Sequence, residues 1–300
     1  MARTSGSTLL VDAPSLIWRS YYALPDSIRA PDGSSINAAH GFLSMLGRLI
    51  LDLRPTRVAC CLDGDWRPAW RVKLVEEYKA SRVAIMEDEP ADEVDRQTDL
   101  IVRILRLARV EVVGSARCEA EDVIATLLPQ LRGPVSIVSG DRDLFQLVRD
   151  PDVVVLYPKR GVSEMWRVNE TEIRSKYGIP GRAYADFAVL RGDPSDGLPG
   201  VPGIGEKSAA QLIAKYGSLE AVVAASEGAR SGPLYKVAVA SDYVARAAQV
   251  VRMKGDCRVG NPDLTLGRPA SKQLKSIART YRLTNPVDRL LEAIASLQPK

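Results

Sequence analysis

Short runs of apolar, β-branched residues alternate with longer amphipathic stretches through the first 180 residues of the chain. Each run is short and continuously apolar, which is typical of a strand buried on both faces of a sheet. The runs span residues 8–11, 57–62, 110–113, 135–138 and 153–157. Between them, residues 38–53, 94–107 and 121–131 repeat apolar side chains at helical spacing. The alternation predicts an α/β domain over residues 1–180, with a mostly parallel sheet flanked by helices.

The pattern changes near Gly178. From Ala183 onward, helical stretches are broken by Gly and Pro, and no run typical of a strand appears. This predicts a second, all-helical region over residues 181–300. The sequence leaves open whether the two regions share one core or fold as separate domains.

Several classes of protein are disfavoured by composition. No stretch reaches the roughly 18 to 20 apolar residues that cross a bilayer, and the first residues lack the apolar segment of an export signal. We therefore expect a cytoplasmic protein with no membrane contact. The four cysteines, which form no CxxC pair, are expected to be structural thiols without a zinc site or disulfide.

A single histidine, His40, excludes a histidine-rich metal site, so any metal ligands must be carboxylates. The net charge is +4 and the pI is near 8.8, which is only mildly basic. This balance favours a polyanionic partner without requiring one.

Acidic residues follow the predicted strands at their carboxyl ends, where functional groups gather in open α/β sheets. Asp12 and Asp63 end the first two strands, and Asp141 and Asp143 follow the fourth. Three more acids open the helix after the third strand: Glu119, Glu121 and Asp122. Taken singly, each acid could simply cap a helix or favour its dipole.

Taken together, these acids cannot all be caps. The carboxyl ends of parallel strands converge, and like charges about 4 Å apart repel by roughly 4 kcal/mol at an effective dielectric constant near 20. Such a cluster needs cations to stay ionised. Oxygen ligands favour Mg²⁺ or Mn²⁺, and carboxylates around two such ions are typical of phosphodiester hydrolysis.

A further acidic pair, Asp193 and Asp196, lies in a turn-rich segment ahead of the glycine-rich sequence 200–209. That sequence predicts a tight hairpin leading into a helix from Lys207 to Tyr216. Exposed backbone N–H groups at such a helix start can hold a DNA phosphate without reading its sequence. The residues expected to contact DNA here are Gly203, Gly205, Lys207 and Ser208. The alternative is a plain connector that uses Gly and Pro as breaks.

In this order the motifs resemble the 5′ nuclease family, which includes the N-terminal domain of bacterial DNA polymerase I, phage 5′ exonucleases and flap endonucleases. The matching pieces are Leu10-Val11-Asp12, Tyr21-Tyr22-Ala23-Leu24, Tyr78-Lys79-Ala80-Ser81-Arg82, Glu119-Ala120-Glu121-Asp122, Gly140-Asp141-Arg142-Asp143-Leu144 and the segment from Gly192-Asp193 to Ser208. Each is a loose pattern alone, but the ordered set covers nearly the whole chain. The resemblance implies a PIN-like sheet, a helical arch and a C-terminal region of helix-hairpin-helix type.

The resemblance also implies roles for single residues. The first metal would be surrounded by Asp12, Asp63, Glu119, Glu121 and Asp122. Asp141 would lie between the metals, and the second would be held by Asp143, Asp193 and Asp196. Lys79 and Arg82 would stand on the arch and reach the scissile phosphate.

Contacts with DNA are implied for Arg19 and for Tyr22, an aromatic side chain that could stack on a frayed base or equally belong to the core. Ser208 and hairpin carbonyls would complete a K⁺ site. Glu121 and Gly197 depart from the usual Asp and Asn, so Glu121 is the least certain ligand.

The predicted activity is therefore that of a 5′ flap endonuclease and 5′-3′ exonuclease acting on branched or nicked DNA in replication and repair. A monomer is expected, working with a separate repair polymerase and ligase. Two alternatives stay open: a PIN-type ribonuclease, and a module that binds branched DNA without cutting it.

Overall fold

The computed structural model describes residues 6–86 and 89–298 of the chain. Its centre is a six-stranded sheet in the order β3-β2-β1-β4-β5-β6, in which only β6 is antiparallel to its neighbour. The strands are β1 (Thr8–Asp12), β2 (Arg57–Asp63), β3 (Glu111–Ser115), β4 (Val135–Val138), β5 (Val153–Arg160) and β6 (Glu164–Val168). All five predicted strands are confirmed, and β6 adds a hairpin that the sequence reading did not include.

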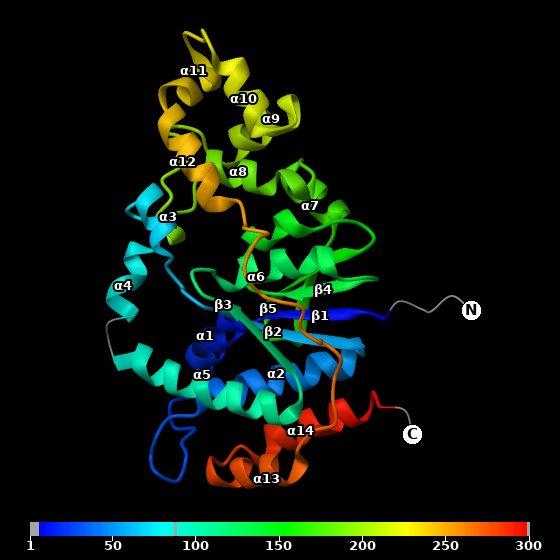
Figure 1. Ribbon diagram of the computed structural model, residues 1–300. Helices are drawn as coiled ribbons and strands as arrows, with labels where there is room; N and C mark the ends of the chain where they lie inside the picture. Colours follow the sequence, from blue (N-terminus) through cyan, green and yellow to red (C-terminus); the bar gives the residue numbers. More distant parts are fainter. Residues whose placement is uncertain (1–5, 87–88, 299–300) are drawn as a thin grey trace, which may run out of the picture.

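Helices surround the sheet and continue beyond it (Figure 1). Before β6 they are α1 (Ala13–Ala23), α2 (Asn37–Leu53), α3 (Ala69–Leu74), α4 (Ala80–Met86), α5 (Glu89–Ala108) and α6 (Ala120–Leu127). After β6 they are α7 (Glu170–Tyr177), α8 (Tyr184–Arg191), α9 (Glu206–Tyr216), α10 (Leu219–Ser226), α11 (Gly232–Val239), α12 (Ser241–Val251), α13 (Ser271–Thr280) and α14 (Thr284–Ala295). Short 3₁₀ turns include η2 (Asp143–Leu147) and η4 (Pro194–Asp196).

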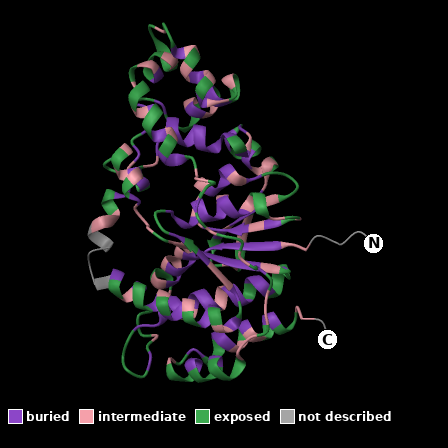
Figure 2. Cartoon of the chain, viewed as in Figure 1, coloured by how far each residue is buried: buried purple, intermediate pink, exposed green. Residues whose placement is uncertain are grey.

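Alternate residues of the central strands serve two separate cores, because successive side chains point to opposite faces of a sheet. On β1, Leu9 and Val11 pack with α1, α2 and α5, whereas Leu10 faces the side of α6 and α8. The strands are therefore buried from both sides, as Figure 2 shows for the centre of the sheet. This double burial explains why the strand sequences are continuously apolar.

The C-terminal half divides in space. Helices α8 to α12 form the apical part at the top of Figure 1, whereas α13 and α14 lie at the other end of the molecule. There they pack against α5 and α2, and Leu274, Leu283 and Leu290 belong to the same core as Leu9. The expected helical region 181–300 thus contributes to both ends, because the apolar faces of α13 and α14 are buried on α2 and α5.

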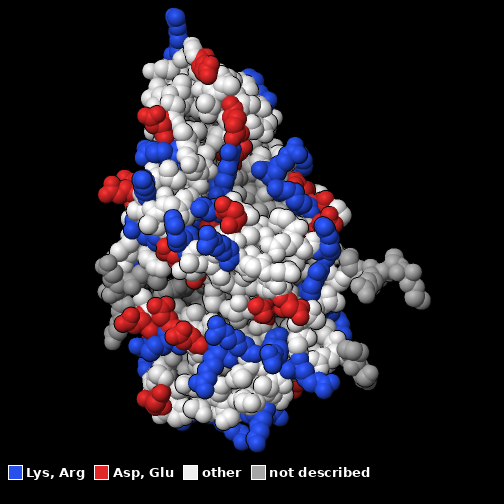
Figure 3. Space-filling model, in the orientation of Figure 1, with Lys and Arg blue, Asp and Glu red and all other residues white. Residues whose placement is uncertain are grey.

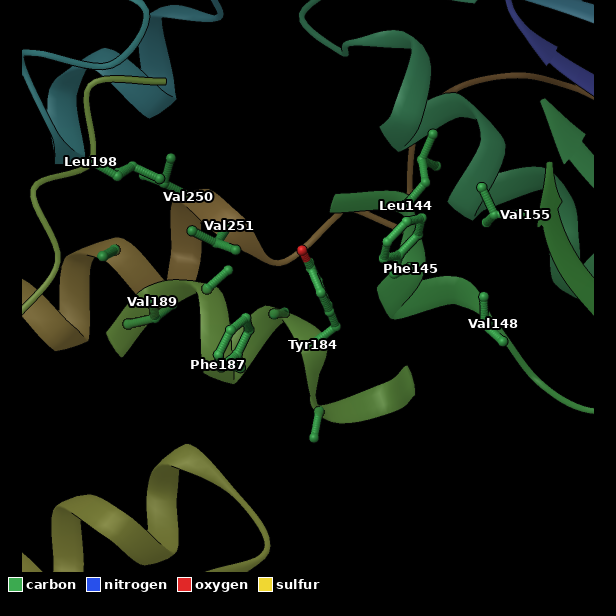
Figure 4. Close-up of a cluster of buried hydrophobic side chains, with 14 of the residues drawn as sticks. Leu144, Phe145, Val148, Val155, Tyr184, Phe187, Val189, Leu198, Val250 and Val251 are labelled. Atoms are coloured by element: carbon green, nitrogen blue, oxygen red, sulfur yellow. The ribbon is translucent and has the colours of Figure 1, made fainter. Parts of the chain in front are cut away.

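The apical part and the sheet share one continuous apolar cluster. Phe145 of η2, Tyr184 and Phe187 of α8, and Val250 and Val251 of α12 belong to it (Figure 4). The rings of Phe145 and Tyr184 lie 5.2 Å apart, centroid to centroid. Of the two arrangements that the sequence allowed, a shared core is the one observed.

One expectation about the cysteines is wrong. Cys60 and Cys61 are buried free thiols, but Cys118 and Cys257 form a disulfide across 139 residues. Spacing could not reveal this pair, because the chain after α12 returns to α6 only in the folded state. The bond joins Cys118, which lies just before α6, to Cys257, which lies in the segment that leaves the apical part after α12.

Within the described ranges, no helix is both long and apolar enough to span a membrane. On the face in Figure 3, basic side chains extend from the apical helices to the opposite end, with acidic ones among them. Charges of both signs are thus interspersed on this face. The net charge of +4 for the whole chain does not by itself reveal an acidic cluster.

Candidate active site

A cavity of about 690 Å³ opens between the carboxyl ends of the strands, α4 and η4. Six of the nine predicted metal ligands line it: Asp12, Asp63, Glu121, Asp141, Asp193 and Asp196. Four cationic side chains line it as well: Lys79, Arg82, Arg142 and Arg191. These residues come from six distant parts of the sequence and meet at the edge of the sheet where the strand-end acids were expected to gather.

The floor of the cavity is built by the neighbouring strands β1 and β4. Asp12 ends β1 and caps α1, where its Oδ1 accepts from the Ser15 amide at 3.3 Å. The Ser139 hydroxyl after β4 donates to the other oxygen of Asp12 and accepts from the Asp141 amide at 2.9 Å. Ser139 thus joins the two carboxylates, and it was not singled out from the sequence.

The side of the cavity formed by β2 and η4 holds three more acids. The amide of Ala120, at the start of α6, donates to Asp63 at 2.7 Å. In η4, the Asp193 carboxylate accepts from the Ser195 amide and hydroxyl at 3.0 and 2.6 Å, and Asp196 is mostly buried. Local turn bonds of this kind fix where the carboxylates point.

Gly197 closes the η4 turn at φ +72°, and a Cβ there would lie 1.9 Å from the Glu77 carbonyl oxygen. Only glycine fits this approach, because any other side chain would collide with the backbone that leads into α4. This close contact with Glu77 explains why position 197 is Gly here rather than the Asn that the resemblance leads us to expect.

Glu119 and Asp122, also predicted as ligands, do not line the cavity. Both are fully buried and cap α6 through a capping box. Glu119 accepts from Arg71, Lys79 and the Tyr78 hydroxyl, and Asp122 accepts from Arg71 at 2.7 Å and the Lys254 amide at 2.8 Å.

Glu121, expected to be the least certain ligand, is the member of this trio that lines the cavity. Its side chain is 17% exposed. Helical geometry explains the division, because positions 119 and 122 share a face that position 121 does not.

Asp143 lies behind the cavity wall rather than on it. It borders a small void together with Arg71, Tyr78, Glu121 and Asp196. Its amide donates to Asp141 Oδ1 at 2.8 Å, so the two acids after β4 are held in one turn.

The two cations that the resemblance assigns to the arch, Lys79 and Arg82, lie in different local structures. Lys79 lies in the turn before α4 at φ +50°, mostly buried, and its ammonium binds Glu119. Arg82 belongs to α4 and binds Asp196. Both cations are therefore directed into the acidic cluster.

Burial, and then repulsion between neighbouring carboxylates, raises the pKa of several of these acids. Burial raises the pKa of Asp12 from its ordinary 3.8 to about 8. Burial and then Glu121 raise the pKa of Asp63 to about 6. Burial and then Asp196 raise the pKa of Asp141 to about 6. The pKa of Asp143 is also raised, by burial and by Asp141.

Glu121 differs from these acids. Although burial opposes ionisation, Lys79 and then Arg71 lower the pKa of Glu121 below its ordinary 4.5. Unlike Asp12, Asp63 and Asp141, it is therefore favoured in its charged form by the two cations.

No group of three or more acidic, histidine or cysteine side chains in the described ranges is already arranged to hold a metal ion. The donor chemistry nevertheless suits one. Six carboxylates share the cavity with four basic side chains, and desolvation raises the pKa of Asp12, Asp63 and Asp141. A divalent cation would offset that cost, because it favours the ionised form of its oxygen ligands.

Aromatic side chains form one wall. Trp18 and Tyr22 line the cavity, and their rings stack with centroids 5.8 Å apart. The side chain of Tyr22 is 66% exposed, so it is not part of the core. Arg19 does not line the cavity, but its guanidinium lies against Gly140, which does.

The hairpin residues lie in the apical part. Gly205 is the N-cap of α9, and Lys207 and Ser208 belong to the first turn of that helix. Gly203 and Gly205 are exposed, and the Gly203 carbonyl accepts from the Lys236 ammonium at 3.0 Å. None of the four predicted hairpin contacts lines the cavity.

Arg71 is the main residue of this region that the sequence reading missed. It is 1% exposed and binds both Glu119 and Asp122. Its helix, α3, is only six residues long and gives no periodic signal that one arginine points inward.

The chain matches two domain families over most of its length. Residues 7–178 match the 5′-3′ exonuclease, N-terminal resolvase-like domain, and residues 179–285 match the 5′-3′ exonuclease, C-terminal SAM fold. A 5′-3′ exonuclease of Streptomyces coelicolor is 43% identical over 303 residues, covering 96% of this chain and 100% of that protein. DNA polymerase I of Mycobacterium bovis is 43% identical over 225 residues, covering 74% of this chain and 24% of the polymerase.

Among solved structures, the bacteriophage T5 D15 flap endonuclease, in a complex with DNA and metal ions, has a TM-score of 0.65 at 14% identity. The likeness covers 97% of this chain and 98% of the phage chain, and at this identity it shows the fold alone. The boundary between the two matched domains lies at residue 178, where the strand pattern of the sequence ends. The chain belongs to the 5′-3′ exonuclease family of metal-dependent nucleases.

Proposed function

We propose that the chain hydrolyses phosphodiesters near the 5′ end of branched or nicked DNA, as a flap endonuclease and 5′-3′ exonuclease. The observation that carries this proposal is the cavity, where six carboxylates meet Lys79 and Arg82 beside the stacked pair of Trp18 and the exposed Tyr22. Acids for metal ions, cations for a phosphate and rings for a base are the three elements that such a cut requires.

The carboxylates would hold two or more Mg²⁺ or Mn²⁺ ions. Asp12, Asp63 and Glu121 would form one ligand group, Asp193 and Asp196 the other, with Asp141 between them. When bound, such ions lower the pKa of water and neutralise charge on the attacked phosphate. Glu119, Asp122 and Asp143, also predicted as ligands, would orient this set from behind, through Arg71 and the Asp141 turn.

Lys79 and Arg82 would turn toward the scissile phosphate once the carboxylates have other cations. Two positive side chains there stabilise the charge that develops on the phosphate oxygens. Tyr22, stacked on Trp18 at the cavity mouth, would support the terminal base, and Arg19 would contact the backbone nearby.

The hairpin would hold the duplex through backbone amides and Lys207, without reading sequence. A K⁺ ion bound by Ser208 and hairpin carbonyls belongs to the same proposal. Lys236 already supplies a cation to one such carbonyl, that of Gly203. A K⁺ ion would therefore need other carbonyls of the hairpin.

The duplex grip can be tested at one glycine. Gly205 has φ −93° and open space where a Cβ would stand, so Gly205→Val leaves the fold unstrained. We expect the affinity for flap duplexes to fall about tenfold, because the side chain blocks the approach of a phosphate to the start of α9. Fluorescence anisotropy would measure this, with Gly255→Val, another glycine with open space, as the matched control. An unchanged affinity would make the hairpin a connector.

Metal binding should depend on pH in a defined direction. The folded chain holds protons on Asp12 up to about pH 8, and on Asp63 and Asp141 up to about pH 6, whereas unfolded carboxyls lose them near 3.8. The metal-free fold should therefore lose stability as pH rises from about 4 to 8.

Because a bound ion displaces these protons, we expect Mn²⁺ to raise the unfolding temperature more at pH 8 than at pH 5.5. Differential scanning fluorimetry of the unliganded chain, with and without Mn²⁺, measures both trends. An Mn²⁺ shift that stays constant with pH would contradict the assignment of these three ligands.

Substrate class is decided by comparing a 5′ flap duplex with linear RNA of the same sequence. We expect metal-dependent cleavage of the flap within a few nucleotides of the junction and little cleavage of the RNA. Preferred RNA cleavage would support the ribonuclease alternative, and tight flap binding without any cut would support the non-catalytic one. Action as a monomer in the cytoplasm, alongside a repair polymerase and a ligase, completes the proposal.

A further inference from the structure

The charged side chain of Arg71, in α3, is only 1% exposed, and the proposed reaction gives it no direct part. We propose that Arg71 is a positioning residue that sets the first turn of α6, and thereby directs Glu121 into the cavity. This inference rests on the proposed function, since it assigns Glu121 to the metal site.

The guanidinium of Arg71 donates to three partners and also lies within ion-pair distance of Glu121. Its Nη1 and Nη2 atoms donate to Glu119 and Asp122, the latter at 2.7 Å, and Nε donates to the Val250 carbonyl at 3.1 Å. The Cζ atom of Arg71 lies 4.8 Å from the centroid of the Trp70 ring. Only a planar fork makes such divergent bonds, so lysine could satisfy just part of the set.

These bonds fix the start of α6 from behind. Glu119 and Asp122 are 0% exposed, so without Arg71 part of their charge would be buried and uncompensated. With it, positions 119 and 122 are held on one side of the turn. Glu121 is left on the other side, 3.6 Å from Nη1, at the cavity wall.

The same side chain joins the site to the apical part. Val250 lies in α12, and the segment after that helix continues the contact, with the Lys254 amide donating to Asp122 at 2.8 Å. Lys254 also places its ammonium 4.2 Å from the centroid of the Trp70 ring. Arg71 therefore connects α3, the helix α6 that carries Glu121, and the apical part that would bind the duplex.

The test is Arg71→Lys, which keeps the charge but loses the fork. Calorimetry with Mn²⁺ alone, without DNA, should show affinity reduced about 10-fold to 100-fold, the usual range when a residue that orients a ligand is lost. In single-turnover cleavage, the Mn²⁺ concentration for half-maximal rate should rise by the same factor. The rate at saturating Mn²⁺ should stay within about threefold of the parent, because no cavity-lining group has changed.

Arg67→Lys is the matched control. Arg67 lies just before α3, four residues from Arg71, and among the described residues its guanidinium donates to the Tyr78 and Glu76 carbonyls, at 2.6 and 2.9 Å. We expect its Mn²⁺ affinity to match the parent's. If both variants lose affinity equally, or Arg71→Lys loses none, Arg71 merely supports the fold and the inference is overturned.

A second variant covers the case in which Arg71→Lys does not fold. Arg71→Met with Asp122→Asn removes one charge of each sign, which leaves less uncompensated charge in the interior. Weakened Mn²⁺ binding in the folded double variant supports the positioning role, and parental binding refutes it. Failure of the parent chain to bind Mn²⁺ or to cut flaps would instead overturn the proposed function, and this inference with it.

Discussion

Asp141→Asn is expected to reduce single-turnover cleavage of a 5′ flap duplex at least about a thousandfold, a loss typical of removing one preorganised group from an active site. Asp141 lines the cavity beside the Ser139 link to Asp12, and its pKa is raised by burial and by Asp196. Asp141 thus lies between the two proposed ligand groups: Ser139 links it to Asp12 of one group, and its charge interacts with Asp196 of the other. Asparagine keeps the shape and the oxygen that accepts the Asp143 amide, but removes the charge.

DNA affinity of this variant should stay within about threefold of the parent, since the residues proposed to grip the duplex lie in the apical part. Asp65→Asn provides the control, because Asp65 also follows a strand end and accepts only the Arg67 amide at 3.1 Å. Flap affinity by anisotropy and cleavage rates by quenched flow give the two readouts. Parallel loss of binding and cleavage would show that Asp141 supports the DNA grip rather than the chemistry.

Lys79→Ala and Arg82→Ala should each slow single-turnover cleavage by about two to three powers of ten, equivalent to roughly 3 to 4 kcal/mol of transition-state stabilisation. Both cations line the cavity and bind acids of the cluster. Replacing Lys79 leaves Glu119 bound to Arg71 and the Tyr78 hydroxyl, so the fold should persist.

The control for both cations is Lys73→Ala, an exposed charge on α3. If Lys79 and Arg82 only attracted DNA, their replacement would lower the DNA affinity and reduce its salt dependence. The cleavage rate at saturating DNA would then stay constant. Rates of the two variants within threefold of the parent would remove Lys79 and Arg82 from the catalytic set. The carboxylates and bound ions would then carry the mechanism.

Some acids of the site are located by the ends of predicted strands, and others are not. Asp12, Asp63 and Asp141 follow strands whose apolar runs are visible in the sequence, and all three line the cavity. Asp193 and Asp196 lie outside the sheet, and only the resemblance placed them in the site. Their position depends on η4 packing under the backbone of Glu77, which no local pattern encodes.

The trio at the start of α6 shows the opposite case. Residue identity suggested that Glu121 was the weakest candidate, yet it faces the cavity while Glu119 and Asp122 are buried. The spacing already put positions 119 and 122 on one face, but it could not tell which face the cavity occupies. That choice was made by Arg71, a partner 48 residues from Glu119 in the sequence.

By itself, the sequence determined the α/β class, the five parallel strands and the acids at the ends of β1, β2 and β4, because burial on both faces and strand-end charge leave local patterns. It also determined the family, through motifs in fixed order. Tertiary structure alone decided the Cys118–Cys257 bond, the return of α13 and α14 to α2, and which acids are solvated or paired with Arg71. These depend on contacts between distant segments, whose free energy exists only once the chain has brought them together.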